Sequence, residues 1–460
     1  MGWRRKAVAV QDGDILEREI AAWKTSRQRA MQIKGFAYFV GQHDICARQR
    51  TAIGRDGKLE RLENVPNSRL VNNQFGKLVT QKTNYLLGKP FAMEGEDAAY
   101  IGRLRGIFDK RFLRLLKNLG KAMLCGGIAW LYPYYDENGA LAFRMFPAYE
   151  ILPLWQDSEH TRLERAVRVY LRERFDGHAF VLEEKVEVYG PAGVQCLALE
   201  NGRLTADEDA LGAGVLPYSF WGGASAGWPR VPLVPFKANE NETPLLQRVK
   251  TLQDGLNLMF SDFENRMQED PRNTILVLKN YDGTDLGEFR RNLAQYGAVK
   301  VRTEGDAQGG VETLKVEFNA ENYRVILSLL RDAITENGMG FDARDTRLSG
   351  NPNQMNIRSM YSDIDLDADE METEMQASFE ELLTFIEVYL ARAGEASSGR
   401  VTFLFNRDML MSESEAIGNC TASAQMLSRE TVVAKHPWVD DPQRELERLR
   451  RQEAAGQEQL

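Results

Sequence analysis

The pattern of apolar residues between Thr243 and Gly338 predicts two long helices that flank a small folded insert. In the first helix the apolar residues recur every three or four positions, so they share one face along its length. They are Leu245, Val249, Leu252, Leu256, Met259, Phe263 and Met267. Thr243 is the expected N-cap, and the helix should end at Asp270 because Pro271 follows. We expect Leu252, Leu256, Met259 and Phe263 to pack against other helices.

The second helix is expected from Ala320 to Gly338, and the insert between the two helices has a β-α-β-β pattern. The insert's expected elements are a strand at Thr274–Leu278, a helix at Leu286–Tyr296, and strands at Ala298–Val301 and Leu314–Phe318. Two long helices with a compact insert at one end are typical of a stalk with a tip. An ordinary helical hairpin inside a globular core is the alternative.

The chain before this pair changes from a helical to a strand pattern near residue 127. Helices are expected over residues 12–33, 67–88 and 112–125. Alternating strands follow at 128–135, 140–146, 166–171, 180–189 and 194–199, with turn residues between them. We predict one antiparallel sheet over residues 127–215, packed on the helices, and a linker at 212–235. The fold class is therefore α+β.

The segment Met339–Gln354, after the second long helix, is polar and contains two glycines. It carries Asp342, Arg344, Asp345, Arg347, Asn351 and Asn353. A loop between two long helices projects into whatever those helices surround, and Gly340 and Gly350 would let it move. A solvent-exposed connector with self-compensating charge is the alternative. A very long helix is expected over 355–392, then a strand at 400–405 and a mostly helical tail.

Composition narrows the classes of function. The chain has 460 residues and a net charge of -9, which does not suit tight binding of nucleic acid through its phosphates. The four cysteines are far apart in sequence and indicate neither a disulfide framework nor a zinc site. No apolar run is long enough to cross a bilayer, and the basic start has no apolar region of a signal peptide after it.

No catalytic or cofactor motif survives inspection, so we predict that the protein is not an enzyme and needs no cofactor or metal. The four histidines are isolated, and no phosphate-binding G-x-x-x-x-G-K-[ST] loop is present. Residues 223–227 match the five-residue nucleophile elbow, but prolines follow where that motif needs a helix. Asp363, Asp365, Asp367, Asp369 and Glu374 have calcium-loop spacing, with Ala368 where glycine is required. We interpret them as a solvated acidic face of one continuous helix.

The order of these parts resembles the portal proteins of tailed bacteriophages, in the large siphophage-type family. Several stretches within residues 60–395 resemble that family directly. They are Asn67-Ser68-Arg69-Leu70-Val71 through Tyr85-Leu86-Leu87-Gly88-Lys89-Pro90, Val231-Pro232-Leu233-Val234-Pro235-Phe236, Asn239-Glu240-Asn241, Ser261-Asp262, and Gly350-Asn351-Pro352 followed by Met360–Glu374. The chain departs from the family at Asn353-Gln354, where Ser-Gly is common.

The resemblance implies a homododecamer, a closed ring of about twelve identical subunits. This ring is the head–tail connector at one capsid vertex, and double-stranded DNA passes through it during packaging and ejection. The family's parts would be a wing (1–241), stem helices (242–270 and 320–338), a clip (271–319), a DNA-facing channel or tunnel loop (339–354), a long wing helix (355–395) and a crown (396–460).

The implied partners are the terminase, a head-completion adaptor, and the capsid and scaffolding proteins, with no membrane. The terminase would supply ATP hydrolysis, and the ring would assemble in the cytoplasm of the bacterial host before it becomes part of the virion. An acidic chain suits a channel that passes DNA without holding it. Two alternatives remain: another structural ring or scaffold of a virion without a DNA channel, and an enzyme with an unrecognised site.

Overall fold

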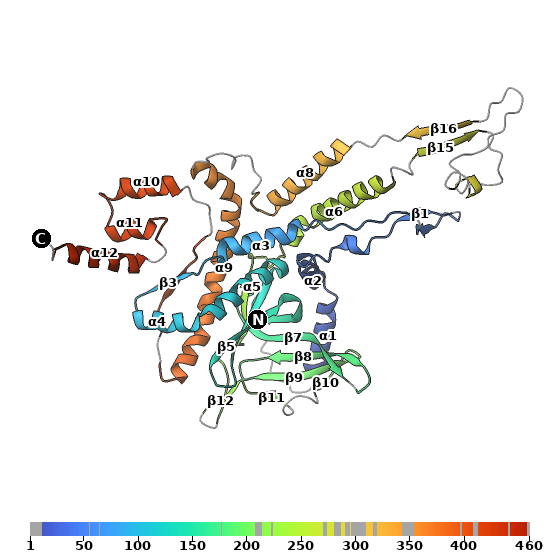
Figure 1. Cartoon of the computed structure of the whole chain (residues 1–460). Helices are drawn as coiled ribbons and strands as arrows, with labels where there is room; N and C mark the ends of the chain where they lie inside the picture. Colours follow the sequence, from blue (N-terminus) through green and yellow to red (C-terminus); the bar gives the residue numbers. More distant parts are fainter. Residues whose placement is uncertain are drawn as a thin grey trace, which may run out of the picture. The chain divides into compact units, whose positions relative to one another are not determined.

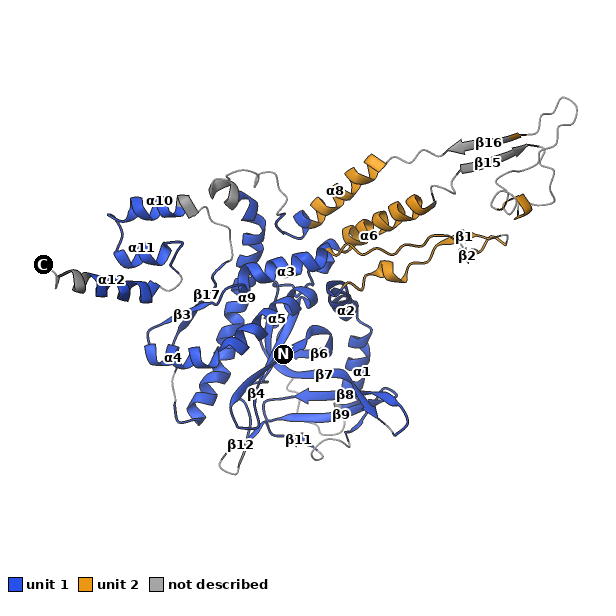
Figure 2. Ribbon diagram, viewed as in Figure 1, with its two compact units in different colours: residues 1–40, 74–249, 335–460 blue, residues 41–73, 250–334 orange. Residues whose placement is uncertain are grey.

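The computed structural model describes residues 12–54, 56–63, 65–175, 177–207, 214–221, 224–269, 274–279, 287–289, 295, 310–315, 320–342, 354–395, 398–407, 413–439 and 442–457. The chain divides into two compact units (Figure 2). The first unit comprises residues 1–40, 74–249 and 335–460, and the second comprises residues 41–73 and 250–334.

The first unit contains helices and several antiparallel sheets, the largest of which have six and three strands (Figure 1). These helices are α1 (Asp12–Lys24), α2 (Arg27–Phe39), α3 (Gln74–Leu87), α4 (Ala98–Ile107), α5 (Lys110–Gly126), the short η2 (Ala148–Glu150), α9 (Gln354–Arg392), α10 (Glu413–Ser423), α11 (Arg429–Lys435) and α12 (Pro442–Gln457). The single helix predicted over 12–33 is wrong, because Ser26 interrupts it. The Ser26 side chain accepts a hydrogen bond from the Arg29 amide at 3.2 Å and so caps α2.

The strands expected in one sheet form two. The three-stranded sheet has the order β14 (Val234–Lys237), β4 (Ile128–Tyr135), β5 (Leu141–Pro147). The larger sheet has the order β10 (Arg203–Ala206), β9 (Val194–Glu200), β8 (Phe180–Tyr189), β7 (Leu163–Phe175), β6 (Ile151–Trp155), and β11 (Val215–Leu216) also pairs with β9. The single sheet fails because β14, from the predicted linker, pairs with β4, and η2 separates β5 from β6.

The core of the first unit is built around α9 and the three-stranded sheet. The Phe379 ring on α9 lies 5.7 Å from that of Phe236 on β14 and 4.4 Å from that of Phe403 on β17 (Val401–Leu404). Strand β17 pairs with β3 (Ala92–Gly95), which brings the chain after α9 back to α4. The long helix expected at 355–392 is confirmed, and its apolar side is a principal part of this core.

The second unit contains most of the two long helices, α6 (Leu246–Glu269) and α8 (Ala320–Asn337). Both predicted helices are confirmed, although α6 begins later than expected from Thr243. The strands β15 (Thr274–Lys279) and β16 (Gly310–Lys315) pair antiparallel, and residues 287–289 and 295 are helical. The predicted strand Ala298–Val301 lies outside the described residues. The remaining elements are η1 (Asp44–Ala47) and the hairpin of β1 (Thr51–Ile53) and β2 (Leu59–Arg61).

Residues 66–73 are extended, so the helix predicted from Asn67 is wrong before Gln74. Alternate amides of this segment donate to side chains on α6. Ser68 N donates to Asn265 Oδ1 at 2.7 Å, Leu70 N to Ser261 Oγ at 3.0 Å, and Asn72 N to Asn257 Oδ1 at 2.9 Å. Gln253 Nε2 then donates to the Asn72 carbonyl at 2.7 Å. We call these four α6 residues, Gln253, Asn257, Ser261 and Asn265, the polar ladder.

The polar ladder forms because two repeats match in length. Two residues of an extended chain advance about 6.6 Å, and four residues of a helix advance about 6.0 Å. Each second amide of the segment therefore meets the same face of α6 one turn further along. All four ladder side chains are buried, so this face of α6 is polar although it is not solvated.

The predicted apolar stripe of α6 is partly buried within the described chain. Leu256 is fully buried, whereas Leu252, Met259 and Phe263 are half-buried. The Phe263 ring lies 5.4 Å from that of Tyr323 on α8. Met267, at the end of the stripe, is 51% exposed. The assignment of these residues to a stem remains a prediction.

Candidate functional site at the start of the 339–354 segment

The segment 339–354 begins at a tightly specified helix end. Gly340 N donates to the Thr335 carbonyl at 2.8 Å, and Met339 N donates to the Glu336 carbonyl at 2.9 Å. This pair of bonds is the Schellman arrangement, with Met339 in the left-handed conformation at a φ of 48°. A Cβ atom at Gly340 would lie 2.3 Å from Leu78 Cδ2. Gly340 therefore packs closely against α3, and its part in loop movement stays a prediction.

Two neighbouring side chains of α3 hold the backbone that follows. Gln81 makes a paired contact with Phe341: its Oε1 accepts from the Phe341 amide at 3.0 Å, and its Nε2 donates to the Phe341 carbonyl at 2.6 Å. Lys82 Nζ donates to the Met339 carbonyl at 2.9 Å. Three backbone groups at the start of the segment are thus fixed by side chains from α3.

Lys82 also belongs to a buried ion cluster. Its ammonium lies 2.6 Å from Asp367 Oδ2 on α9, and Arg248 contacts the other oxygen of that carboxylate at 2.6 Å. The Lys82 and Asp367 side chains are only 2% and 6% exposed. Burial lowers the pKa of Lys82, and the neighbouring Asp367 opposes that shift. We interpret the cluster as a clamp between α3, α6 and α9, because a buried charge without its partner is costly.

An aromatic stack continues from the same point. The Phe341 ring stacks on Tyr361 of α9 with centroids 4.5 Å apart, and Tyr361 stacks on Tyr85 of α3 at 5.7 Å. The Tyr85 hydroxyl donates to Asp365 at 2.8 Å, and burial raises the pKa of Tyr85. Arg407, which follows β17 in the chain, contacts Asp365. This ion pair connects the aromatic stack to the chain after β17.

Four acidic residues on α9 are paired with cations: Asp365, Asp367, Asp369 and Glu372. The continuous helix expected across Asp363–Glu374 is confirmed. Asp367 is buried against Lys82 and Arg248, so its prediction as part of a solvated face is wrong. Arg407 also contacts Asp369, and it contacts Glu372 at 3.0 Å. In the described part of the chain, no group of three or more His, Cys, Asp or Glu is arranged to hold a metal ion.

The structure places few of the predicted loop residues. Asp342 is half-buried next to Phe341, whereas Arg344, Asp345, Arg347, Asn351 and Asn353 lie outside the described residues. Sequence reasoning missed Gln81 and Lys82, and it placed Asp367 on a solvated face. A usable signal existed for Lys82, because it lies on the buried face of α3 four residues after Leu78 and four before Leu86.

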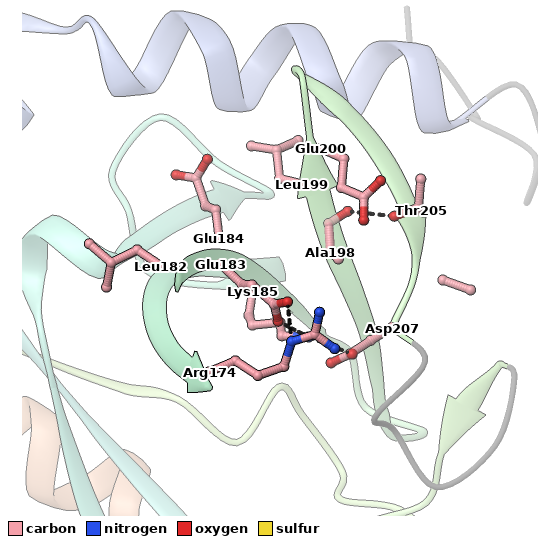
Figure 3. Close-up of a pocket in the computed structure, with 11 residues that line it drawn as sticks. Arg174, Leu182, Glu183, Glu184, Lys185, Ala198, Leu199, Glu200, Thr205 and Asp207 are labelled. Atoms are coloured by element: carbon pink, nitrogen blue, oxygen red, sulfur yellow. Dashed lines mark hydrogen bonds and ion pairs between the residues drawn. The ribbon is translucent and has the colours of Figure 1, made fainter. Parts of the chain in front are cut away.

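A groove of about 410 Å³ lies on the larger sheet, away from this site (Figure 3). Four of its charged side chains pair with one another: Lys185 lies 2.7 Å from Asp207 and 3.2 Å from Glu183, and Arg174 lies 2.6 Å from Glu183. Ser225, the serine of the elbow-like pattern rejected above, lies in β13 (Ala224–Ala226), which pairs with β12 (Ser219–Trp221). A strand in a hairpin does not have the strand–turn–helix geometry that an elbow nucleophile needs.

Comparison with known proteins gives consistent matches over nearly the whole chain. Residues 16–459 match the family model described as "Phage portal protein, SPP1 Gp6-like". The chain is 27% identical over 429 residues to the portal protein of Bacillus phage SPP1, which covers 91% of this chain and 82% of that protein. It is 26% identical over 444 residues to the portal protein of Clostridium phage phiCD119, which covers 92% of both. No helix among the described residues has the length and apolar character required to span a membrane.

Proposed function

We propose that the segment 339–354 of this chain, which belongs to the family of SPP1 Gp6-like phage portal proteins, is the part that contacts DNA in the channel of the portal ring. Portal proteins are structural proteins of the phage particle, and they assemble into a ring at a capsid vertex through which DNA passes. The observation that carries the proposal is the attachment of the segment's first residues. Gln81 and Lys82 bind the backbone of Met339 and Phe341, so the start of the segment is held against α3.

The remaining parts of the ring subunit follow the same proposal. Residues 1–241 and 355–395 would form the wing, 242–270 and 320–338 the stem, 271–319 the clip, and 396–460 the crown. The confirmed helices α6 and α8, with the β15–β16 pair between them in sequence, support the stem and clip. The half-buried Leu252, Met259 and Phe263 are then available to pack on stem helices of adjacent subunits.

The test of the DNA contact reverses the loop's two positive charges. We expect Arg344→Glu combined with Arg347→Glu to leave ring assembly and incorporation into procapsids unchanged, while less DNA is packaged. The matched control reverses Arg324 and Arg448, whose side chains are 80% and 59% exposed in α8 and α12. Normal packaged length and rate in the loop variant would remove this segment from the mechanism.

The clip is proposed as the docking surface for the terminase and for the head-completion adaptor. The terminase would hydrolyse ATP, so the ring itself needs no catalytic site. Deletion of residues 280–318 should leave rings intact and abolish adaptor binding. Loss of the ring would instead make this region part of the assembly core. Electron microscopy distinguishes a portal from another virion ring or scaffold, since only a portal needs a central hole wide enough for duplex DNA.

A further inference from the structure

A row of cations runs along α5 in a chain that is acidic overall. Lys110, Arg114, Lys117 and Lys121 follow one another at intervals of four, three and four residues, which places their side chains on one face of the helix. The buried leucine and phenylalanine side chains of this part of α5 lie on the opposite face. At 1.5 Å per residue the row is about 16 Å long. We call these four residues the α5 stripe.

The α5 stripe belongs to a segment in which one sign of charge dominates. Residues 98–126, which comprise α4, α5 and the two residues between them, contain seven lysines and arginines and one acid, Asp109. The Asp109 carboxylate accepts hydrogen bonds from the Arg111 and Phe112 amides at 2.8 and 2.9 Å, so it caps α5. Because the whole chain has a net charge of -9, this segment is a local reversal of charge.

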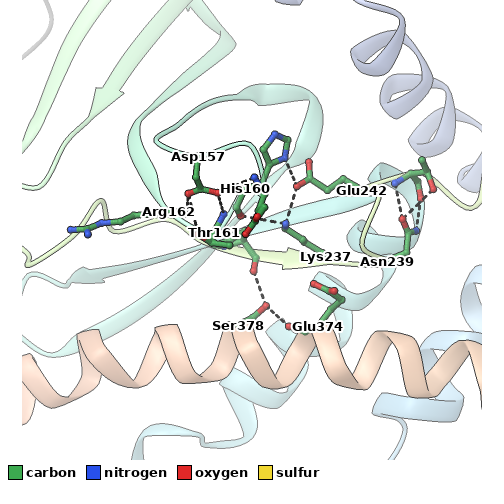
Figure 4. A network of polar contacts seen from close by, with 12 residues as sticks. Asp157, His160, Thr161, Arg162, Lys237, Asn239, Glu242, Glu374 and Ser378 are labelled. Atoms are coloured by element: carbon green, nitrogen blue, oxygen red, sulfur yellow. Dashed lines mark hydrogen bonds and ion pairs between the residues drawn. The ribbon is translucent and has the colours of Figure 1, made fainter. Parts of the chain in front are cut away.

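The stripe's charges are not neutralised within the described part of the subunit. Among the residues that the structure describes, none of the four forms an ion pair. Lys237 of the same unit, by contrast, lies 3.1 Å from the Glu242 carboxylate (Figure 4). Lys110 and Arg114 are exposed, and the other two cations of the stripe are half-buried. A concentrated positive surface of this kind attracts an anion from outside the subunit.

A hollow of about 210 Å³ lies beside the stripe, between α5 and residues 87–91. Arg114 and Lys117 line it from α5, and Lys89 lines it from the other side. Its remaining lining residues are apolar or glycine, so it is lined by three cations and no acid. Lysine and arginine cover apolar surface with their aliphatic stems and keep their charged ends in water, where an anion can reach them. A water molecule occupies about 30 Å³ of liquid, so the hollow has room for a phosphate group.

We propose that the α5 stripe, together with Lys89, binds the phosphate backbone of duplex DNA outside the segment 339–354. The phosphates of a DNA strand are closely spaced negative charges, and four cations over about 16 Å can contact several of them at once. Phosphate contacts carry no sequence information, which suits a ring that passes DNA of any sequence. The acidic row on α9 of another subunit is a poorer partner, because four of its carboxylates pair with cations of their own subunit.

The test measures binding of a short mixed-sequence DNA duplex to the full-length protein by fluorescence anisotropy, over about 50 to 200 mM salt. If the stripe neutralises four phosphates, it should contribute about -3.6 to the slope of log K against log[salt]. Arg114→Gln with Lys117→Gln should flatten the slope by about 1.8 and weaken binding by about tenfold or more at low salt. Arg114→Lys should keep the slope, since it retains the positive charge.

The matched control is Arg324→Gln with Arg448→Gln, which removes the same charge from side chains that are 80% and 59% exposed on α8 and α12. This control should bind the duplex like the unaltered protein. Lys110→Gln is an independent variant at an exposed position of the stripe, and it should flatten the slope by about 0.9. Melting curves and electron microscopy of each variant show whether folding and rings are preserved.

The proposal is overturned if the Arg114/Lys117 variant and the unaltered protein have the same salt slope, or if the control loses as much binding as that variant. Loss of rings with unchanged DNA binding would also overturn it and would assign the stripe to a contact between subunits. Arg344→Glu with Arg347→Glu should leave most of this binding unchanged. Loss of all binding in that loop variant would overturn the role of the stripe and leave the proposed role of the segment 339–354 standing.

Discussion

The polar ladder makes a prediction that the hydrophobic pattern would not. Asn257 is fully buried, and its Oδ1 accepts from the Asn72 amide at 2.9 Å and from Gln253 Nε2 at 3.1 Å. Its Nδ2 lies 2.8 Å from His43 Nδ1. Asn257→Leu preserves the approximate shape and removes all three interactions. If burial of apolar surface alone decided stability, this change would stabilise the protein, because the side chain at position 257 is out of contact with water.

The magnitude follows from the groups that lose their partners. Three hydrogen bonds contribute about 1 kcal/mol each, and a buried amide without an acceptor costs about 1–3 kcal/mol. Burial of the additional apolar surface of leucine stabilises the folded state by about 1 kcal/mol. We expect a net loss of at least about 3 kcal/mol, which corresponds to a hundredfold or larger change in the local opening equilibrium.

Amide hydrogen exchange measures this effect at the ladder itself. The Asn72 amide should exchange at least about a hundredfold faster in Asn257→Leu, with smaller changes at Leu70 and Ser68. Gln268→Leu, on the exposed end of α6, controls for added hydrophobicity. Unchanged protection of Asn72 in Asn257→Leu would refute the ladder as the element that holds residues 66–73.

Three further predictions concern burial and charge. Lys82→Met leaves Asp367 with one cation and should lower the free energy of unfolding by about 3 kcal/mol in thermal denaturation. Arg324→Met removes an exposed ion pair and should change that free energy little. Leu256→Asp buries a charge and should cost about 4 kcal/mol and lower the melting temperature of the ring; an unchanged melting temperature would contradict the packing. Burial raises the pKa of Glu381 from 4.5 to about 7, so the folded state holds an extra proton between these values. Stability should therefore fall by roughly 3 kcal/mol as pH rises through this window, and Glu381→Gln should remove that slope in denaturant titrations.

Local periodicity predicted most of the secondary structure but not its assembly. Strands β4 and β8 and helix α8 occupy the expected residues, because each has a strong period and a clear turn or stop at its ends. The division into two sheets depends on β14, whose Val234–Lys237 pairs with β4 about a hundred residues earlier in the chain. The sequence of neither strand alone indicates that it pairs with a strand so far away in the chain.

The candidate site was harder to predict for an electrostatic reason. Asp367 belongs to a row of acids that alternate along α9, and nothing local distinguishes it from Asp363 or Asp369. Its burial depends on Lys82 and Arg248, which come from two other helices. The polar ladder was not predicted for a similar reason. Asn and Ser on a helix normally face solvent, whereas here an extended segment supplies their hydrogen-bond partners. Whether a polar side chain is buried depends on a partner that is distant in the sequence. The hydrophobic pattern around that side chain contains no information about such a partner.

The charge balance of the 339–354 segment leads to the last prediction. In a ring, any net charge on the segment is repeated in every subunit, so about twelve uncompensated cations would face the DNA. Since each neutralised phosphate contributes about -0.9 to the salt slope of log K, one extra positive charge per subunit would approach a slope of -10, which is typical of tight binding. On the proposed role of the segment, Asp342 and Asp345 would prevent this, because their charges equal those of Arg344 and Arg347 in number. We expect Asp345→Asn to assemble normally but to slow DNA movement at low salt, with recovery as salt is raised. Packaging rates measured across a salt series would contradict this reasoning if Asp345→Asn and the unaltered protein respond in parallel.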